Sequence, residues 1–157
     1  MTPLNRHWKW IACLFGFGLP LLLLSCRPNR TDIAVSDKAV SLNAEGVHFP
    51  CDPPLSRQFR TASLLLEIDG QWTISPPWQE ITFESGKRTK IYATAITIDG
   101  QTFSSSLLGA VYQNGNKMVN IRFSPEIPKM LAIREFVIKA EPEIICSKVI
   151  WHDFDNL

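Results

Sequence analysis

The sequence predicts an all-β domain, a small antiparallel β-sandwich of immunoglobulin-like or jelly-roll-like type. Three observations lead to this prediction. From Arg57 onward, short alternations of apolar and polar residues recur roughly every 8–12 residues, the spacing of strands in a sandwich. Gly, Pro and Asn turn residues separate these segments, and no window shows a helical period. The 157 residues are enough for one hydrophobic core and too few for two.

The amino-terminal segment has the pattern of an export signal. Its first ten residues carry Arg6, His7 and Lys9 but no acidic residue, and residues 11–24 are apolar, small or proline. A positive region followed by a short apolar region is typical of a secretory signal peptide. The apolar run is shorter than the roughly 20 residues that a transmembrane helix needs, and Pro20 weakens a helix further. We therefore expect this segment to direct export.

The end of this segment, Leu23-Leu24-Ser25-Cys26, resembles the lipobox of bacterial lipoproteins. The resemblance covers the leader alone, and Leu24 departs from the Ala or Ser that is more usual there. It implies that residues 1–25 are a lipoprotein signal peptide and that Cys26 becomes the first residue, carrying diacylglycerol and a further acyl chain such as palmitate. Two or more acyl chains give stable membrane anchoring. The alternatives are a plain secretory leader or an uncleaved anchor with a chance cysteine.

The resemblance also implies a location in the cell envelope, with the body facing the periplasm or the exterior. In enterobacterial-type lipoproteins, an Asp directly after the acylated cysteine implies retention in the inner membrane. This chain has Arg27 there, which favours the outer membrane.

The remaining cysteines suggest a disulfide. Cys13 leaves with the leader and Cys26 is expected to be acylated, so Cys51 and Cys146 remain. An even pair in an exported chain suggests one disulfide, which would join the start of the domain to its last strand. Closing so long a loop contributes up to about 4–5 kcal/mol in the chain-entropy account. The alternatives are two buried thiols or a metal pair, and the metal pair is disfavoured because no CxxC spacing or neighbouring histidine accompanies them.

The sequence after Cys26 divides into a tether and a domain. Residues 26–46 are polar and contain no aromatic residue, which predicts an acylated cysteine and a flexible tether that lifts the domain off the membrane. A short strand near Ile33–Val35 is the one element expected there. Residues 47–157 form the predicted β-sandwich domain, which begins with an irregular proline-rich segment.

Eight strands are expected in the domain, or nine if residues 103–112 form two strands instead of one bent strand. They cover residues 59–69, 72–75, 78–84, 89–99, 103–112, 118–123, 131–140 and 144–151. Asp69-Gly70, Asp99-Gly100 and Asn114-Gly115 are hairpin turn signals, because glycine adopts a positive φ at little cost. A phase shift in the alternation around Arg134-Glu135 predicts a β-bulge.

The last of these strands is expected to place Ile145, Val149 and Trp151 on its inner face. Cys146 then falls on the outer face, so that the predicted disulfide would join the outside of the sheet. The residues that follow Trp151 are expected to form a solvated tail.

No catalytic constellation is present in the sequence, and no cofactor is expected. The loop Ser85-Gly86-Lys87 lacks the first glycine and the final Ser or Thr of a phosphate-binding loop, and no G-x-S-x-G elbow occurs. If the two cysteines pair, His48 and His152 could approach each other and form a metal site with Asp52 or Asp153. Surface histidines are the favoured interpretation, so no metal site is predicted.

Tryptophan provides the better indication of binding. Trp72 and Trp78 flank Ser75-Pro76-Pro77, and if exposed they would form a stiff platform for a sugar ring or a partner peptide. The alternative is that one or both fill the core, which is favoured for Trp72 and evenly balanced for Trp78.

The charge narrows the class of function. Removal of Arg6 and Lys9 with the leader leaves 14 basic against 15 acidic groups, which argues against a nucleic-acid binder. The leading hypothesis is a non-enzymatic envelope lipoprotein that acts as an interaction or assembly module for an envelope protein. The second is a module that binds glycan or cell-wall polymer through the two tryptophans. The third is a hydrolytic or metal-dependent enzyme with an unfamiliar site near the two histidines.

Overall fold

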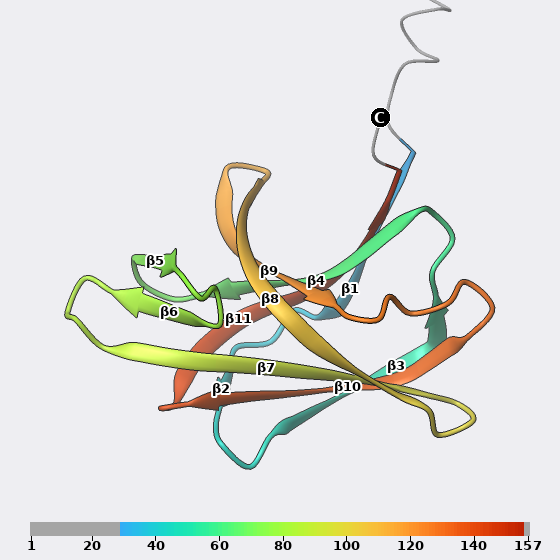
Figure 1. The fold of residues 1–157 in the computed structure, drawn as a ribbon, viewed down its shortest axis with the longest axis horizontal. Helices are drawn as coiled ribbons and strands as arrows, with labels where there is room; N and C mark the ends of the chain where they lie inside the picture. Colours follow the sequence, from blue (N-terminus) through green and yellow to red (C-terminus); the bar gives the residue numbers. More distant parts are fainter. Residues whose placement is uncertain (1–28, 156–157) are drawn as a thin grey trace, which may run out of the picture. The chain divides into compact units, whose positions relative to one another are not determined.

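The computed structural model describes residues 29–155, and these residues confirm the predicted all-β class (Figure 1). They form eleven strands, and every strand pairing among them is antiparallel. No helix in this part of the chain could span a membrane. The leader and Cys26 lie outside the described residues.

The strands form a sandwich in which one strand belongs to both layers. The first layer contains β1 (Arg30–Ser36), β2 (Val40–Leu42), β4 (Thr61–Ile68), β9 (Asn116–Phe123) and β11 (Ile144–Phe154). The second contains β3 (Val47–Ser56), β5 (Trp72–Ser75), β6 (Glu80–Phe83), β7 (Arg88–Thr97) and β10 (Ala132–Glu141). The long strand β8 (Thr102–Gln113) pairs with β7 through its first half and with β9 through its second half.

The core lies between the layers and follows the period of two that the sequence shows. Leu64 and Leu66 of β4 are fully buried against apolar residues of the opposite layer. At the centre, the ring of Phe136 lies 6.2 Å from that of Phe123 and 5.6 Å from that of Trp151. Burial of each such side chain stabilises the fold by about 1.5–3 kcal/mol, so this contact between β9, β10 and β11 holds the layers together.

Two of the three predicted hairpin turns are confirmed. Asn114 and Gly115 both have positive φ, 50° and 81°, and connect β8 to β9 by a two-residue loop. Asp99-Gly100 connects β7 to β8. The prediction of a hairpin at Asp69-Gly70 is wrong, because β4 pairs with β9 and β11 whereas β5 pairs only with β6. The turn instead takes the chain from one layer to the other.

The bulge predicted near Arg134-Glu135 is confirmed, because the register of β10 shifts between Ile133 and Glu135 against both of its neighbours. A second register shift, between Cys146 and Lys148 on β11, was not foreseen. It reverses the alternation, so that Cys146 is buried on the core side and Ile145 faces outward. The prediction of an outward Cys146 is therefore wrong, since one inserted residue exchanges the two faces of a strand.

The predicted tether is wrong from Arg30 onward. The short strand expected near Ile33–Val35 is present, but it belongs to the longer β1, which pairs with β11 from Arg30 to Ser36. Strand β2 then pairs with β11 as well. The segment is polar because β1 lies at the border of the sheet with most of its side chains in solvent.

The expected solvated tail is also wrong, because β11 continues to Phe154. Trp151 and Asp153 are almost completely buried. The Asp153 carboxylate accepts backbone hydrogen bonds from Gln58 (2.5 Å) and Phe59 (3.0 Å) in the connection between β3 and β4. The polar sequence of this strand therefore supports a buried structural contact and is not a sign of solvation.

Candidate functional site

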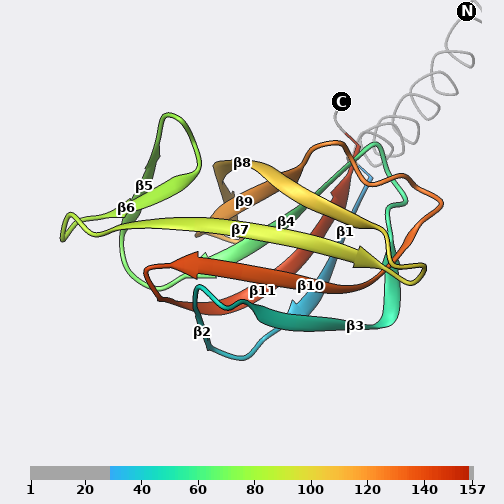
Figure 2. The same ribbon diagram turned by 60° about the horizontal axis from the view of Figure 1, so that its bottom comes forward.

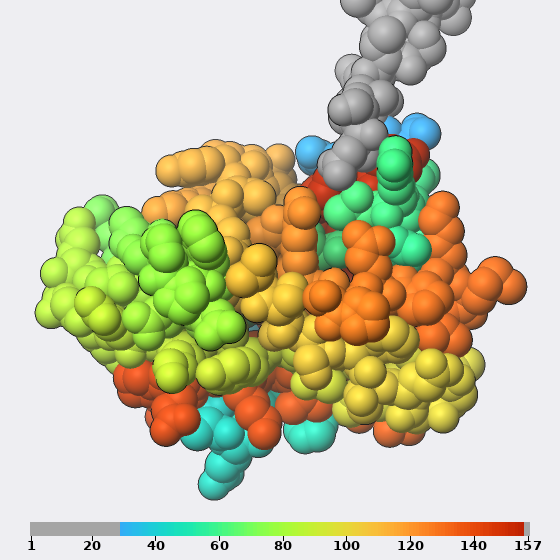
Figure 3. All heavy atoms as spheres, viewed as in Figure 1, coloured from blue at the N-terminus to red at the C-terminus, as the bar shows by residue number. Residues whose placement is uncertain are grey.

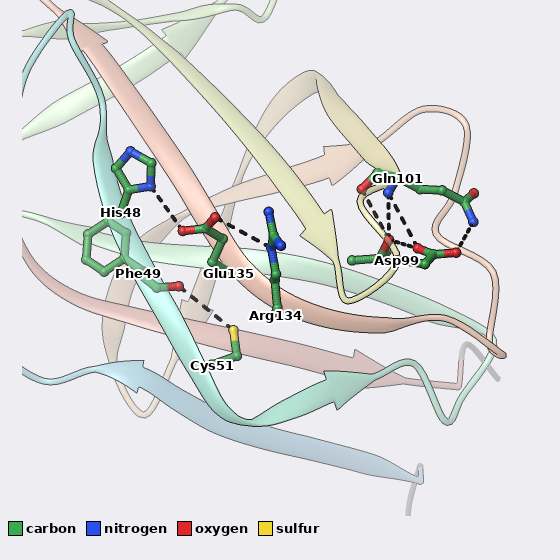
Figure 4. Close-up of polar contacts among 8 residues, drawn as sticks. His48, Phe49, Cys51, Asp99, Gln101, Arg134 and Glu135 are labelled. Carbon is green, nitrogen blue, oxygen red and sulfur yellow. Dashed lines mark hydrogen bonds and ion pairs between the residues drawn. The ribbon is translucent and has the colours of Figure 1, made fainter.

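The two cysteines that the sequence pairs are free thiols in the structure, so the predicted disulfide is absent. Cys51 lies on β3 and Cys146 on β11, strands that do not pair with each other. Each thiol donates to a carbonyl on its own strand, Cys51 to Phe49 (3.9 Å, Figure 4) and Cys146 to Lys148 (3.2 Å). Both are part of the core, which corresponds to the alternative of two buried thiols.

Burial also makes both thiols poor nucleophiles. Removal from water raises the pKa of Cys51 to about 11, and the neighbouring Glu135 carboxylate adds to this rise. Burial raises the pKa of Cys146 to about 12, with Asp69 and Glu67 adding to it and the hydrogen bond to Lys148 opposing it. Since the thiolate is the reactive form, neither cysteine is suited to nucleophilic catalysis near neutral pH.

The two histidines contact different acidic residues. Figure 4 shows His48 beside Glu135, with 3.0 Å between Nδ1 and Oε2. His152 Nδ1 lies 2.5 Å from Asp32 Oδ1, and its ring stacks on Phe154 at 4.4 Å. Within residues 29–155 no group of His, Cys, Asp and Glu side chains could hold a metal ion. The His48–His152 cluster considered from the sequence is therefore not formed by the described residues.

Trp72 is 3% exposed, which excludes it from an open platform. Lys117 of β9 covers it: the ammonium lies 4.5 Å from the ring centroid and donates to the Trp72 carbonyl at 2.6 Å. The core position that the sequence favours for Trp72 is confirmed, and a lysine 45 positions later in the chain covers the ring.

Trp72 does, however, line a pocket of about 530 Å³ between the β5–β6 hairpin and the β8–β9 hairpin. The two hairpins lie side by side in Figure 3, in green and in gold to orange. Tyr112, which is 74% exposed, lies on the β8 side of the pocket. The remaining polar lining residues are Glu67, Gln71, Thr73, Thr82, Glu84, Asn116 and the Lys117 that covers Trp72. This pocket, which we call the Trp72 pocket, combines aromatic carbon with hydroxyl, amide and carboxylate groups.

Trp78 is 50% exposed and belongs to a second surface. Its carbonyl accepts a hydrogen bond from the Leu108 amide at 2.7 Å, which fixes the β5–β6 turn to the middle of β8. Tyr92 and Leu107, each about half exposed, line a small hollow of about 50 Å³ beside this contact. We call Trp78, Tyr92 and Leu107 the aromatic patch.

The backbone at Trp78 is strained. Its φ of 59° lies in the left-handed region, which a residue with a bulky side chain rarely adopts. The Trp78 amide donates to the Ser75 carbonyl at 2.8 Å and so holds the turn in this form. Strain of this kind costs about 1–3 kcal/mol and is concentrated at functional positions. The turn therefore maintains a large aromatic residue at the surface at the expense of local stability.

The sequence identified Trp78 but missed Tyr92, Leu107 and Tyr112. The polar–apolar alternation of β7 places Tyr92 on the outward face, between Lys90 and Thr94, and that signal was available. Leu107 had no such signal, because a register shift between Ser105 and Leu107 changes the face to which β8 presents its side chains.

The fold defines the class as a small antiparallel β-sandwich with an open pocket and an exposed aromatic surface. No protein-family model matches this chain, and no curated protein or solved structure is significantly similar to it. A β-sandwich hosts many unrelated functions, so the two surfaces, and not the fold, indicate the function.

Proposed function

We propose that this chain is a lipid-anchored envelope protein whose β-sandwich body is a non-catalytic interaction module. The anchor is Cys26, on the resemblance of the leader to a lipobox. The observation that carries the interaction is the aromatic patch, because Trp78, Tyr92 and Leu107 are about half exposed on neighbouring elements. Aromatic residues are enriched at the centres of protein interfaces, where they contribute much of the binding energy.

The test is site-specific crosslinking in membranes of the native host. A photoreactive residue at Leu107 is expected to capture a discrete envelope protein, and Trp78→Ala is expected to reduce this capture at least several-fold. The matched control is Ile33→Ala, which removes a partly exposed apolar residue on β1, away from the patch. Unchanged capture in the Trp78 variant, or no protein neighbour at all, would count against the proposal.

The Trp72 pocket supports a second candidate, the binding of a glycan or cell-wall polymer. Its mixture of aromatic carbon with hydroxyl and amide groups matches the two faces of a sugar ring. Unlike the expectation from the sequence, the stacking residue here is Tyr112, since Trp72 is covered by Lys117.

Tryptophan fluorescence across a panel of cell-wall oligosaccharides tests this candidate, because Trp72 lines the pocket. A spectral change that is lost in Tyr112→Ala would support it. A change that persists in this variant would place the ligand elsewhere, and an unchanged spectrum with every sugar would remove the candidate.

A further inference from the structure

One end of the β-sandwich gathers the first residue of β1 and three connections. Arg30 of β1 pairs with Phe154 of β11, which pairs in turn with Thr61 of β4. The β3–β4 connection precedes Thr61, and the β3 terminus at Ser56 pairs with Ala132 at the beginning of β10. In Figure 2 this end lies on the right, with the β7–β8 turn and the β9–β10 loop, whereas the β5–β6 hairpin lies on the left. We call it the amino-terminal end of the sandwich.

Two large apolar side chains project from the connections at this end. Met130 in the β9–β10 loop is 94% exposed, and Ile98 in the β7–β8 turn is 62% exposed. The two segments are fastened together, because the Ile98 amide donates to the carbonyl of Ala132 at 2.9 Å. Transfer of such exposed apolar side chains from water to an apolar environment has a favourable free energy. Met130 and Ile98, on adjacent connections, therefore form a candidate contact surface.

The turn that carries Ile98 is held in one shape by its polar neighbours. The Asp99 carboxylate accepts hydrogen bonds from the Thr97 hydroxyl and from the side-chain amide of Gln101. Figure 4 shows the contact between Asp99 and Gln101. These hydrogen bonds also hold the pKa of Asp99 below its usual value. The carboxylate is therefore directed back into the turn, and Ile98 is presented on a fixed support.

The charges beside these residues suit the surface of a phospholipid bilayer. Lys129 directly precedes Met130, and Arg60 lies in the β3–β4 connection; both are exposed and have no ion-pair partner among the described residues. A long basic side chain next to an apolar one can place its charge among headgroups while the apolar residue enters the acyl boundary. Glu126, which lies in the β9–β10 loop with Lys129, is already paired with Arg57, with 2.9 Å between Oε2 and Nη1.

The short length of chain between Cys26 and β1 favours a phospholipid bilayer as the partner of this surface. Only three residues separate Cys26 from Arg30, and four Cα–Cα steps span at most about 14 Å. If Cys26 is acylated, as in the proposed function on which this inference rests, Arg30 is held within that distance of the bilayer interface. The end of the sandwich that contains Arg30 is then the end closest to the membrane.

We propose that the amino-terminal end of the sandwich docks on the membrane surface, with Met130 and Ile98 in the headgroup–acyl boundary. The Trp72 pocket then lies at the far end of β4, because Glu67 and Ile68 line it whereas Thr61 lies at the docked end. Seven strand steps separate Thr61 from Ile68, about 23 Å. Docking therefore turns the pocket away from the bilayer.

The test uses the full acylated chain in vesicles of phosphatidylethanolamine and phosphatidylglycerol that contain a brominated phospholipid. An environment-sensitive fluorophore is attached in turn to Met130→Cys, Ile98→Cys and, as a matched exposed control at the far end, Tyr112→Cys. Because Cys51 and Cys146 are buried and Cys26 is acylated, labelling is confined to the new thiol. Quenching is expected to be several-fold stronger at positions 130 and 98 than at position 112.

Mass spectrometry of the amino-terminal peptide from the same preparation separates the two proposals. Acylated Cys26 with equal quenching at all three positions, or with quenching at position 112 alone, would overturn docking and leave the anchor intact. A peptide without acyl chains would overturn the anchor and with it the docking that depends on it.

Discussion

The buried carboxylate of Asp153 fixes the β3–β4 connection, which joins the two layers of the sandwich. Asp153 is 1% exposed and accepts the amides of Gln58 and Phe59, so it holds the β3–β4 connection against β11. We expect Asp153→Ala to lower the free energy of unfolding by about 2–4 kcal/mol, because two amides lose a charged acceptor.

Urea unfolding followed by tryptophan fluorescence measures this loss. Asp155→Ala is the matched control: Asp155 accepts one amide, that of Arg60, at 3.0 Å in an exposed position, and its removal is expected to cost less than about 1 kcal/mol. Equal losses in the two variants would show that burial of Asp153 adds nothing to its hydrogen bonds.

The buried thiols make a prediction about pH. The pKa values of Cys51 and Cys146, about 11 and about 12, exceed their ordinary value of 9.0, so the folded state favours the protonated thiols. Their contribution to stability is complete below pH 9 and is lost as the pH rises through 11 to 12. We expect the native protein to resist iodoacetamide at pH 8, whereas the denatured protein takes up two labels beyond any at Cys26. Rapid labelling of either thiol in the native protein would contradict the assigned burial.

At the scale of single residues the sequence predicted part of the site. The Pro-Pro-Trp turn indicated an aromatic residue of undecided exposure, and the structure exposes Trp78. The sequence did not indicate that Lys117 would cover Trp72, because that contact joins segments far apart in the chain. It also misplaced Cys146, because a bulge on β11 depends on pairing with β4 and leaves little trace in the alternation.

Among the structural elements, the β8–β9 hairpin is specified most locally. Its turn requires a positive φ at Gly115, where an added Cβ would meet no atom within 4 Å. We expect Gly115→Ala to destabilise the fold by about 1 kcal/mol through backbone strain alone. Gly109→Ala on β8 is the control, because its φ is not positive and its Cβ would make only ordinary contacts, at 3.9 Å and beyond. Thermal unfolding compares the two variants, and a Gly109 variant as unstable as the Gly115 variant would contradict the role of the turn.

Strand β1 is the element that the sequence predicted least well. Its length was underestimated because a border strand with a solvated face has the composition of a linker. The central strands β4, β7 and β9 were located closely from their apolar residues. Only β7 shows a clear period of two in its burial, whereas β4 and β9 each contain four consecutive buried residues, because Leu65 and Met118 belong to a second apolar cluster.

Hydrogen exchange tests the assignment of β1. We expect the amides of β1 that face β11 to be protected, because the two strands pair from Arg30 to Ser36. The amide of Ser85 in the β6–β7 turn, which is exposed and donates no hydrogen bond within the described residues, provides the comparison within the same chain. Exchange in β1 as fast as in this turn would contradict the strand and support the flexible tether that the sequence predicts.

In the whole molecule, the two ends of the sandwich have different proposed roles. The amino-terminal end is proposed to lie on the membrane, and the other end presents the Trp72 pocket beside the β8–β9 hairpin. The all-β class followed from strand spacing and turn residues, which are local properties. The path of the chain between the layers did not, since Asp69-Gly70 has the sequence of a hairpin but connects strands that do not pair.

We propose that Cys26 is acylated and that the mature chain begins there, four positions before β1 begins at Arg30. Intact-mass and peptide mass spectrometry of the protein purified from membranes of its native host tests it most directly. We expect residues 1–25 to be absent and the amino-terminal peptide to carry diacylglycerol and a further acyl chain on Cys26. A chain that retains Met1, or one with a free thiol at Cys26, would contradict it.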